Sequence, residues 1–222
     1  DMRIVDLRLT SGILARGGTI LGTSRLIPPL DGEQMDVMAE NFKRSGMDAL
    51  IAVGGENTLK IAFDLYKRYD VPIVGVPKSI DNALSGTDYT FGFDTAVNIA
   101  TECIDRLHTT AESHHRIMVI EVMGRYTGWI ALEAGIAGGA HIICVPEFSL
   151  NINDICDALK ERHKRGKTFS IVVASEGAKI HGYSVTPEGD DMERNHHVGR
   201  IGELIANLIE ENTGYETRVS VL

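Results

Sequence analysis

One polar segment, residues 77–95, carries side chains that could transfer a proton to or from a bound alcohol. It follows an apolar run at 71–76 that predicts a buried strand, and it precedes a helical pattern that starts near Asp94. Loops at the carboxyl ends of strands are where open α/β sheets bind ligands. Asp81 has a hydroxyl two residues before it and an amide directly after it, which suits a general base. A structural turn is the alternative, because these residue types also form turns.

A second polar segment, GGENT at 54–58, lies between a predicted strand and a predicted helix at 58–69. The Gly-Gly turn would leave the first amides of the helix free, and these amides with the helix dipole suit a phosphate. Glu56 beside a phosphate would suit a bridging Mg²⁺, which takes few protein carboxylates together with phosphate oxygens. An ordinary capped helix, with Asn57 or Thr58 as the N-cap, is the alternative.

Three further segments have the same character. Residues 123–128 bring Arg125 to the end of a predicted strand, and residues 175–177 bring Glu176 to the end of another. A glycine-rich segment at 16–25 ends in Arg25, which could reach an anion, although a surface loop is the alternative for so short a motif.

The elements that must position these segments alternate regularly between strand and helix. Short crossovers between them predict an α/β fold of parallel sheets with helices on both faces. Four polar loops follow strands, so we expect them on one ligand-binding edge of one sheet or of two facing sheets. The expected strands are 48–53, 71–76, 116–122, 141–145, 168–174 and 216–222, and the expected helices are 32–46, 58–69, 94–113, 128–137, 151–165 and 199–213.

Composition narrows the class of protein. The 222 residues are 43% hydrophobic and 24% charged, with a net charge of −9, which argues against a sequence-independent nucleic-acid binder. No apolar run approaches the roughly 18 residues of a membrane span, and no signal peptide is visible. Three widely spaced cysteines (Cys103, Cys144 and Cys156) predict free thiols in a reducing compartment, the cytoplasm.

Together, the polar loops would present cations, helix amides, a carboxylate suited to Mg²⁺ and a base. The cations are Lys78, Arg125, Arg25 and Arg218. Cations and amides indicate phosphate ligands, and a base beside Mg²⁺ and phosphates indicates phosphoryl transfer to an alcohol. In such a reaction the protein mostly positions its substrates, neutralises charge and accepts the hydroxyl proton.

Five segments, in order along nearly the whole chain, resemble the 6-phosphofructokinases: GGENT at 54–58, PKSIDN at 77–82, GTDYTFGFDT at 86–95, EVMGRYTG at 121–128 and ETR at 216–218. The resemblance implies a phosphofructokinase-like fold with its site at the carboxyl ends of strands. It also implies transfer of a phosphoryl group from ATP or diphosphate, with Mg²⁺, to the 1-hydroxyl of fructose 6-phosphate, which gives fructose 1,6-bisphosphate.

The resemblance implies a role for each matching residue on the sugar side. Asp81 would be the general base, with Ser79 and Ile80 beside it on the substrate. Met123, Gly124 and Arg125 would hold the sugar phosphate, with Arg125 also near the transferred group. Glu176 would bind a sugar hydroxyl. The 6-phosphate ligands would be Arg116 and Arg218, partly from a neighbouring subunit, which implies a homo-oligomer, either a dimer or a tetramer.

The donor side follows from the same resemblance. Its ligands would be Gly55, Glu56, Asn57, Thr58, Lys78 and Arg25, with Glu56 also on Mg²⁺. ATP users of the family usually have Gly at position 57, whereas diphosphate users usually have Asp there with Lys at 78. Lys78 also appears in some ATP users, but Asn57 fills space as Asp does, so we favour diphosphate slightly on steric grounds. Residues 1–115 would form the donor side and residues 116–222 the sugar side.

The chain departs from the family pattern in three places. The family's first glycine-rich loop and the segment expected after Leu222 have no counterpart, so we expect a central part of a longer protein that is not fully active by itself. Ala83 replaces a second Asp that usually follows the Asp-Asn pair, which would weaken metal or base positioning. Two alternatives therefore stay open: a non-catalytic or regulatory sugar-phosphate-binding paralogue, and an unrelated α/β binding module.

Overall fold

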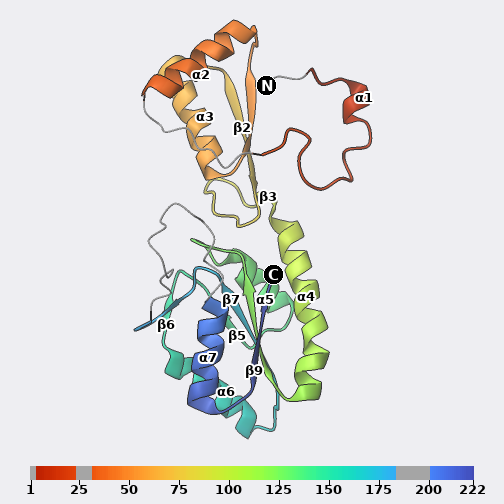
Figure 1. Ribbon diagram of the computed structural model, residues 1–222, viewed down its shortest axis with the longest axis vertical. Helices are drawn as coiled ribbons and strands as arrows, with labels where there is room; N and C mark the ends of the chain where they lie inside the picture. Colours follow the sequence, from red (N-terminus) through yellow and green to blue (C-terminus); the bar gives the residue numbers. More distant parts are fainter. Residues whose placement is uncertain (1–3, 24–31, 184–200) are drawn as a thin grey trace.

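The computed structural model describes residues 4–23, 32–183 and 201–222, which form two layered units joined end to end (Figure 1). A short helix, α1 (Leu7–Thr10), stands to one side of the first unit. The first unit contains α2 (Gly32–Ser45), β1 (Leu50–Gly54), α3 (Glu56–Tyr69), β2 (Ile73–Ser79) and β3 (Phe91–Gly92). The second unit contains α4 (Phe93–His114), β4 (Ile117–Val122), α5 (Trp129–Ala137), β5 (Ile142–Cys144), α6 (Ile152–Lys164), β7 (Ser170–Ser175), α7 (Ile201–Thr213) and β9 (Thr217–Val221).

The first sheet pairs its strands in parallel, in the order β1-β2-β3. Helix α3 packs on one face, where the Leu59 side chain comes within 3.0 Å of the position that a Cβ at Gly75 would take. The small core of this unit consists of Met35, Ala39, Leu65 and Val71. Other apolar side chains of β1 and β2 are half-buried, apart from Ile51, Val53 and Val74, which are 52–69% exposed.

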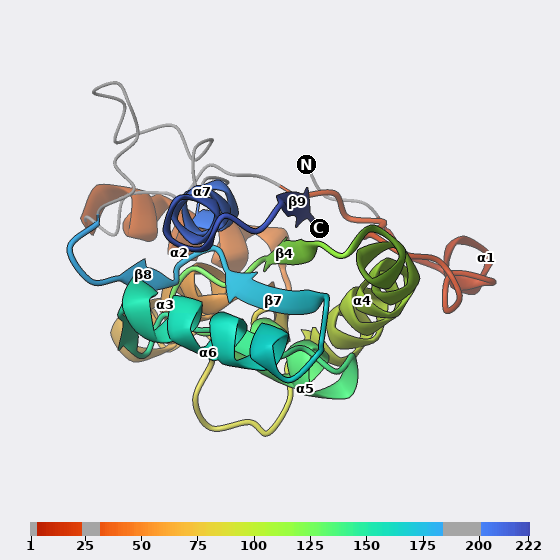
Figure 2. The ribbon, with the colours of Figure 1, turned by 90° about the horizontal axis from the view of Figure 1, so that it is seen from below.

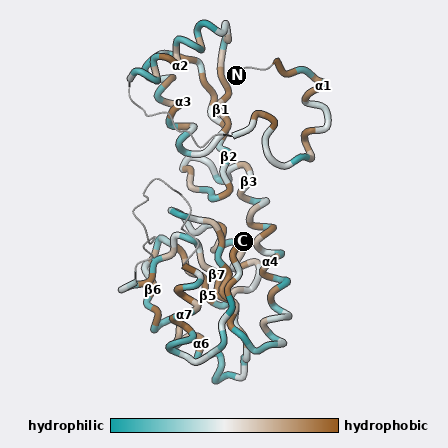
Figure 3. Tube along the Cα trace, viewed as in Figure 1, coloured by the Kyte–Doolittle hydropathy of each residue, from teal (hydrophilic) through white to brown (hydrophobic). Residues whose placement is uncertain are grey.

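The second sheet is also parallel, in the order β5-β7-β4-β9, and every residue of β4 and β7 is buried. Side chains alternate between its faces. Val119 and Val172 pack against α6 and α7, whereas Ile120 and Val173 pack against α4 and α5. Figure 2 shows these helices around the sheet, and Figure 3 shows its strands in the hydrophobic colours. The predicted α/β fold with helices on both faces is confirmed in this unit.

Helix α4 belongs to the second unit by its packing. Its buried residues Ala100, Ile104 and Ala111 share a core with Met118 and Ile120 of β4. The boundary predicted at residue 115 separates the residues expected to bind the phosphoryl donor from those expected to bind the sugar phosphate. That division stays a prediction. The packing boundary lies earlier, where β3 passes into α4.

The start of α3 differs from the sequence expectation. The helix begins at Glu56, and its N-cap is Gly55 rather than Asn57 or Thr58. The reason is close packing, because a Cβ at Gly54 would lie 2.4 Å from the Thr58 hydroxyl oxygen. The first turn therefore folds directly onto the glycine pair. The two-residue strands β3, β6 (Ser149–Leu150) and β8 (Lys179–Ile180) were also not predicted, because two residues carry no detectable periodicity.

Within the described ranges, none of the helices is both long and apolar enough to cross a membrane.

The His141 ring completes the hydrogen bonding at the start of β7. The backbone N–H of His141 donates to the Ile171 carbonyl over 2.8 Å. The backbone N–H of Ile171 in turn donates to the ring nitrogen Nδ1 of His141, also over 2.8 Å. Burial, together with the nearby Arg162 and His108, lowers the pKa of His141 from 6.5 to about 4. The ring is therefore a neutral acceptor in the folded protein.

This lowered pKa predicts a loss of stability in acid. The unfolded chain takes up the His141 proton below about pH 6.5, whereas the folded chain resists it down to about pH 4. We expect His141→Asn, whose side-chain oxygen can accept the same bond, to flatten the fall in unfolding free energy between these pH values. Denaturant unfolding across this range checks the slope, with His181→Asn on the surface as the control. Identical slopes for wild type and His141→Asn would contradict the prediction.

Candidate active site

Parallel register brings the four polar loops together in two pairs. In the first sheet Gly54 is paired with Pro77, so the segments that follow β1 and β2 leave the same edge. In the second sheet Val122 is paired with Ser175, so the segments that follow β4 and β7 leave the same edge. These are the carboxyl edges on which the sequence placed the ligand-binding loops.

A hydrogen bond joins the two edges. The Thr127 hydroxyl, beyond β4, donates to the backbone carbonyl of Asp81, beyond β2, over 2.9 Å. The polar loops therefore form one region between two facing sheets, which was the second of the two arrangements expected from the sequence.

The Asp81 carboxylate is held by its own loop. Its Oδ1 accepts a hydrogen bond from the Ser79 hydroxyl and another from the Ala83 N–H over 3.4 Å. Asp81 is half-buried, so it stays accessible to a ligand. A carboxylate fixed in this way at the edge of a site can accept a proton from a bound hydroxyl group.

The rest of the Asp81 loop is closed by Asn82 and Thr90. Asn82 has a positive φ of 53°, which Asn tolerates better than most residues. Its Oδ1 accepts from the Thr90 N–H over 2.9 Å, and its Nδ2 donates to the Asp88 carbonyl over 3.1 Å. The buried Thr90 hydroxyl donates to the Ser79 carbonyl over 2.8 Å. These bonds make the loop a defined structure rather than a loose connection.

The loop after β4 is packed just as closely. The Ser175 hydroxyl donates to the Gly124 carbonyl over 2.5 Å, and the Gly177 N–H donates to the same oxygen over 3.0 Å. Gly124 has a φ of +150°, and a Cβ on it would lie 2.3 Å from the Ser175 hydroxyl oxygen. A Cβ on Gly177 would lie 2.0 Å from the Arg125 carbonyl oxygen. Glycine is therefore required at both positions.

Glu176 links three predicted site residues electrostatically. Burial raises its pKa, whereas the Arg125 guanidinium and the Gly124 N–H lower it and the Asp81 carboxylate raises it again. Glu176 therefore lies within electrostatic reach of both Arg125 and Asp81. Arg125 itself is exposed and lies 5.4 Å from the centre of the Tyr126 ring.

The predicted donor residues surround the start of α3. Gly55 is the N-cap and has no side chain with which to cap the helix amides, while Glu56, Asn57 and Thr58 form the first turn. The Lys78 carbonyl lies 3.8 Å from the position of a Cβ on Gly55, so the Lys78 backbone runs beside this helix end. A helix N-terminus next to a lysine can bind an anion. Arg25, the remaining donor residue, lies outside the described residues.

Ile80 and Met123 lie at the surface of the same region. Their side chains are 41% and 49% exposed, respectively. A cavity of about 750 Å³ is bordered by the segment that follows Asp81 and by residues beyond β4, and its lining includes Ala83, Tyr89, Thr127, Trp129 and Glu133. Ile80, Asp81 and Met123 are not among its lining residues, although Asn82, directly after Asp81 in the chain, is.

Arg116 and Arg218 lie elsewhere. Arg116 precedes β4, and Arg218 pairs with Met118 near the beginning of that strand. At roughly 3.3 Å per residue along β4, Arg116 lies roughly 20 Å and Arg218 roughly 13 Å from Val122, where the strand ends and the Arg125 segment begins. Both bind Glu216, over 3.0 Å from Arg116 and 2.9 Å from Arg218, and the Arg116 hydrogen bond lowers the pKa of Glu216. The described part of the chain does not bring them to Asp81.

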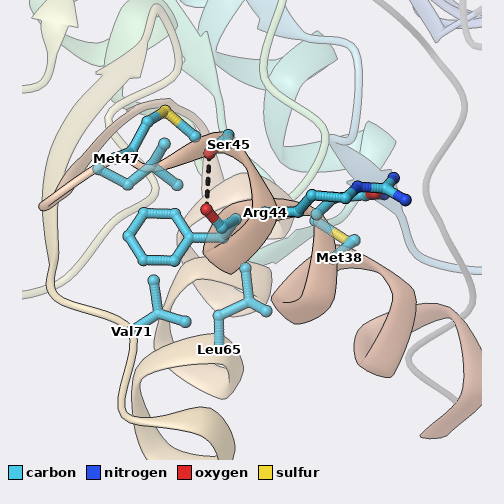
Figure 4. A pocket seen from close by; sticks show the side chains of 9 residues that line it. Met38, Arg44, Ser45, Met47, Leu65 and Val71 are labelled. Carbon is cyan, nitrogen blue, oxygen red and sulfur yellow. Dashed lines mark hydrogen bonds between the residues drawn. The ribbon is translucent and has the colours of Figure 1, made fainter.

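Another cavity, of about 500 Å³, lies near the start of β1 and so away from the polar edges (Figure 4). Met38, Met47, Leu65 and Val71 line it together with Phe42. It contains none of the predicted site residues.

Sequence reasoning did not single out three residues that shape the site. Thr127 binds the Asp81 carbonyl, Ser175 binds the Gly124 carbonyl, and Glu147 Oε1 accepts from the Gly128 N–H over 2.9 Å. Their one sequence signal is that each is a polar residue just beyond, or at the end of, an apolar strand.

Known proteins resemble the chain throughout. Residues 1–222 match the protein-family model for phosphofructokinase. The chain is 48% identical to a pyrophosphate–fructose 6-phosphate 1-phosphotransferase of Streptomyces coelicolor, over 98% of this chain and 64% of that protein. It is 49% identical to an ATP-dependent 6-phosphofructokinase of Corynebacterium efficiens, over 95% of this chain and 61% of that protein. It therefore spans less than two thirds of the length of these relatives.

A solved structure supports the fold. Pichia pastoris phosphofructokinase in the T-state superimposes with a TM-score of 0.82 at 30% sequence identity, over 98% of this chain and 24% of that chain.

The packing of the two sugar-side loops predicts a strong effect of Gly177→Ala. The added methyl would overlap the Arg125 carbonyl, so the backbone must shift, and we expect a loss of at least about 2 kcal/mol of unfolding free energy. Gly32→Ala is the matched control, since nothing lies within 4 Å of its Cβ position, and it should stay within about 0.5 kcal/mol of wild type. Denaturant unfolding measures both. Equal stabilities for the two variants would contradict the described contact.

Proposed function

Because the chain belongs to the phosphofructokinase family, we propose that the protein transfers a phosphoryl group to the 1-hydroxyl of fructose 6-phosphate, with ATP or diphosphate as donor. The product is fructose 1,6-bisphosphate. The observation that carries this proposal is the position of Asp81. Its carbonyl is hydrogen-bonded to Thr127 in the Arg125 loop, its carboxylate lies within electrostatic reach of Glu176, and the Lys78 backbone three residues earlier runs beside the α3 N-terminus. The proposed general base thus lies between the region proposed to bind the sugar and the region proposed to bind the donor phosphates.

The chemistry follows from these positions. Asp81 takes the proton of the 1-hydroxyl while that oxygen attacks the terminal phosphorus of the donor, and the bond from phosphorus to the leaving phosphate or ADP breaks. Arg125 neutralises charge on the transferred group, and the free amides of α3 bind the remaining donor phosphate oxygens. Glu176, half-buried beside Arg125, accepts a hydrogen bond from a sugar hydroxyl.

Glu56 suits Mg²⁺ that is shared with the donor. Its carboxylate is exposed in the first turn of α3, beside the amides assigned to phosphate. Among the described residues, no group of three or more His, Cys, Asp or Glu side chains could hold a metal ion. One carboxylate together with phosphate oxygens is the arrangement that Mg²⁺ commonly adopts. The ion would neutralise charge on the donor phosphates. The Ala83 methyl adds no ligand, so Glu56 is the protein ligand that we assign.

We propose diphosphate as the preferred donor. Relatives that use either donor are almost equally identical to the chain, so overall similarity does not separate them. The argument rests on Asn57, which occupies the first turn of α3 where a nucleotide needs space. The non-catalytic paralogue and the unrelated binding module are not favoured, since the relatives named above carry the names of enzymes.

We also propose a homo-oligomer in which subunits complete each other's sites. Arg116 and Arg218 form a cationic pair at the amino edge of the second sheet, too far from Asp81 to reach the same sugar within one chain. A second copy could bring this pair to the 6-phosphate of a sugar bound near Asp81. A dimer or a tetramer with an isologous contact would satisfy this geometry.

The cysteines agree with the cytoplasm as the place of action. Cys103, Cys144 and Cys156 are all free thiols, and burial raises the pKa of Cys144 to about 12. Thiols of this kind persist in reducing compartments.

The central test is a coupled assay for fructose 1,6-bisphosphate with the full-length protein, Mg²⁺ and fructose 6-phosphate, with ATP and diphosphate in separate runs. We expect Asp81→Asn to lower kcat by about 10²–10⁴, because it keeps the shape of the side chain but removes the base. The exposed Asp105→Asn is the control and should keep the wild-type rate. A full rate in Asp81→Asn, or no product with either donor, would disprove the function. Faster turnover with one donor identifies it.

Mixing two inactive variants tests the shared site. Asp81→Asn and Arg218→Ala should each be nearly inactive alone. If subunits complete each other, hybrids contain one site with both Asp81 and Arg218 intact, so refolding the variants together should raise the rate well above that of either. A mixture no more active than its components would show that each subunit supplies its own phosphate ligands.

A further inference from the structure

Thr127 lies where the two halves of the proposed site meet. Its hydroxyl donates to the Asp81 carbonyl, 46 positions earlier in the chain, over 2.9 Å. Thr127 is half-buried and lines the same cavity as Asn82 and Ala83, the two residues that follow Asp81. Because the hydroxyl proton is donated to the backbone, Thr127 could meet a ligand only as a hydrogen-bond acceptor.

The accepting carbonyl belongs to the peptide that orients the base. On one side of this peptide the Asp81 carboxylate is bound to the Ser79 hydroxyl and the Ala83 N–H. On the other side Asn82 holds a positive φ, with its side chain bound to Thr90 and Asp88. Rotation of the peptide between them would turn the carboxylate. The Thr127 hydroxyl opposes this rotation by binding the peptide oxygen.

The other end of the bond is fixed to the second sheet. The Thr127 carbonyl accepts a longer bond from the Ser175 hydroxyl over 3.4 Å. The next residue, Gly128, donates its N–H to the Glu147 carboxylate over 2.9 Å, and a Cβ there would lie 2.4 Å from the Val145 side chain. Thr127 therefore has a defined position relative to Arg125, two residues before it, and to Glu176, directly after Ser175.

We propose that Thr127 is a positioning residue that fixes the Asp81 carboxylate relative to the sugar-binding loops, an inference that rests on the proposed function. The hydrogen bond of its hydroxyl links the loop that carries the base, at the edge of the first sheet, to the second sheet. Without it, the sugar still binds to its own ligands, but its 1-hydroxyl and the base are less well aligned. The effect should therefore fall on kcat rather than on KM, because misplacement of a reacting group by about 1 Å can cost about a hundredfold in rate.

Three variants of the full-length protein test this role. Thr127→Val removes the hydroxyl and nearly keeps the shape, and we expect kcat to fall about ten- to a hundredfold with KM for fructose 6-phosphate changed less than about threefold. Thr127→Ser keeps the hydroxyl and should recover most of kcat. Thr101→Val is the matched control, because the Thr101 hydroxyl also donates to a backbone carbonyl, that of Val97 over 2.8 Å, but within α4. It should keep the wild-type kcat.

A second readout does not depend on turnover. Hydrogen–deuterium exchange of residues 79–90 should become faster in Thr127→Val, but not in Thr127→Ser or Thr101→Val, because the tie to the second sheet is lost. If wild type makes no product with either donor, the proposed function fails while the exchange experiment still decides whether Thr127 holds the loop.

The proposal is overturned if Thr127→Val retains the wild-type kcat, or if exchange in residues 79–90 is unchanged. A rise in KM with an unchanged kcat would also overturn it, since that result indicates a ligand-binding role. If Thr127→Val cannot be purified in folded form, Thr127→Ala replaces it, and the same outcomes apply.

Discussion

Parallel pairing of the strands is the constraint on which the candidate site depends. Because every strand in a sheet runs the same way, all carboxyl ends lie on one edge. Gly54 thus comes to lie beside Pro77, and Val122 beside Ser175, although each pair is more than twenty residues apart in sequence. The buried strands β4 and β7 supply the stability for this arrangement, with helices packed on both faces. The loops are then free to carry polar side chains.

Much of this fold could be predicted because its signals are local. Apolar runs marked the central strands, amphipathic patterns marked the helices, and glycine with polar residues marked the loops between them. The start of α3 could not be predicted in the same way. Asn57 and Thr58 are good N-caps by propensity, but the close contact of Thr58 with Gly54 moved the cap to Gly55. Packing outweighed the local preference for polar capping side chains.

The site was predictable in its residue types but not in its distances. Asp81, Arg125 and Glu176 are each recognisable from their place after a strand, and the structure brings Asp81 and Arg125 within electrostatic reach of Glu176. The hydrogen bonds that hold these loops together cannot be predicted from the local sequence, because the Thr127–Asp81 and Ser175–Gly124 bonds join segments about fifty residues apart. Arg116 and Arg125 belong to one stretch of sequence, yet the length of β4 separates them.

The pairing of Glu216 with Arg116 and Arg218 changes what an incoming anion must do. Two guanidinium groups share one carboxylate, which leaves one positive charge uncompensated, so an anion that binds them competes with Glu216 for their N–H groups. A monovalent anion such as chloride merely substitutes one negative charge for another, whereas a phosphate dianion adds charge and presents more oxygens to the two guanidinium groups. The internal carboxylate thus acts as a built-in competitor, which favours divalent anions. It also holds two like charges side by side before any ligand binds.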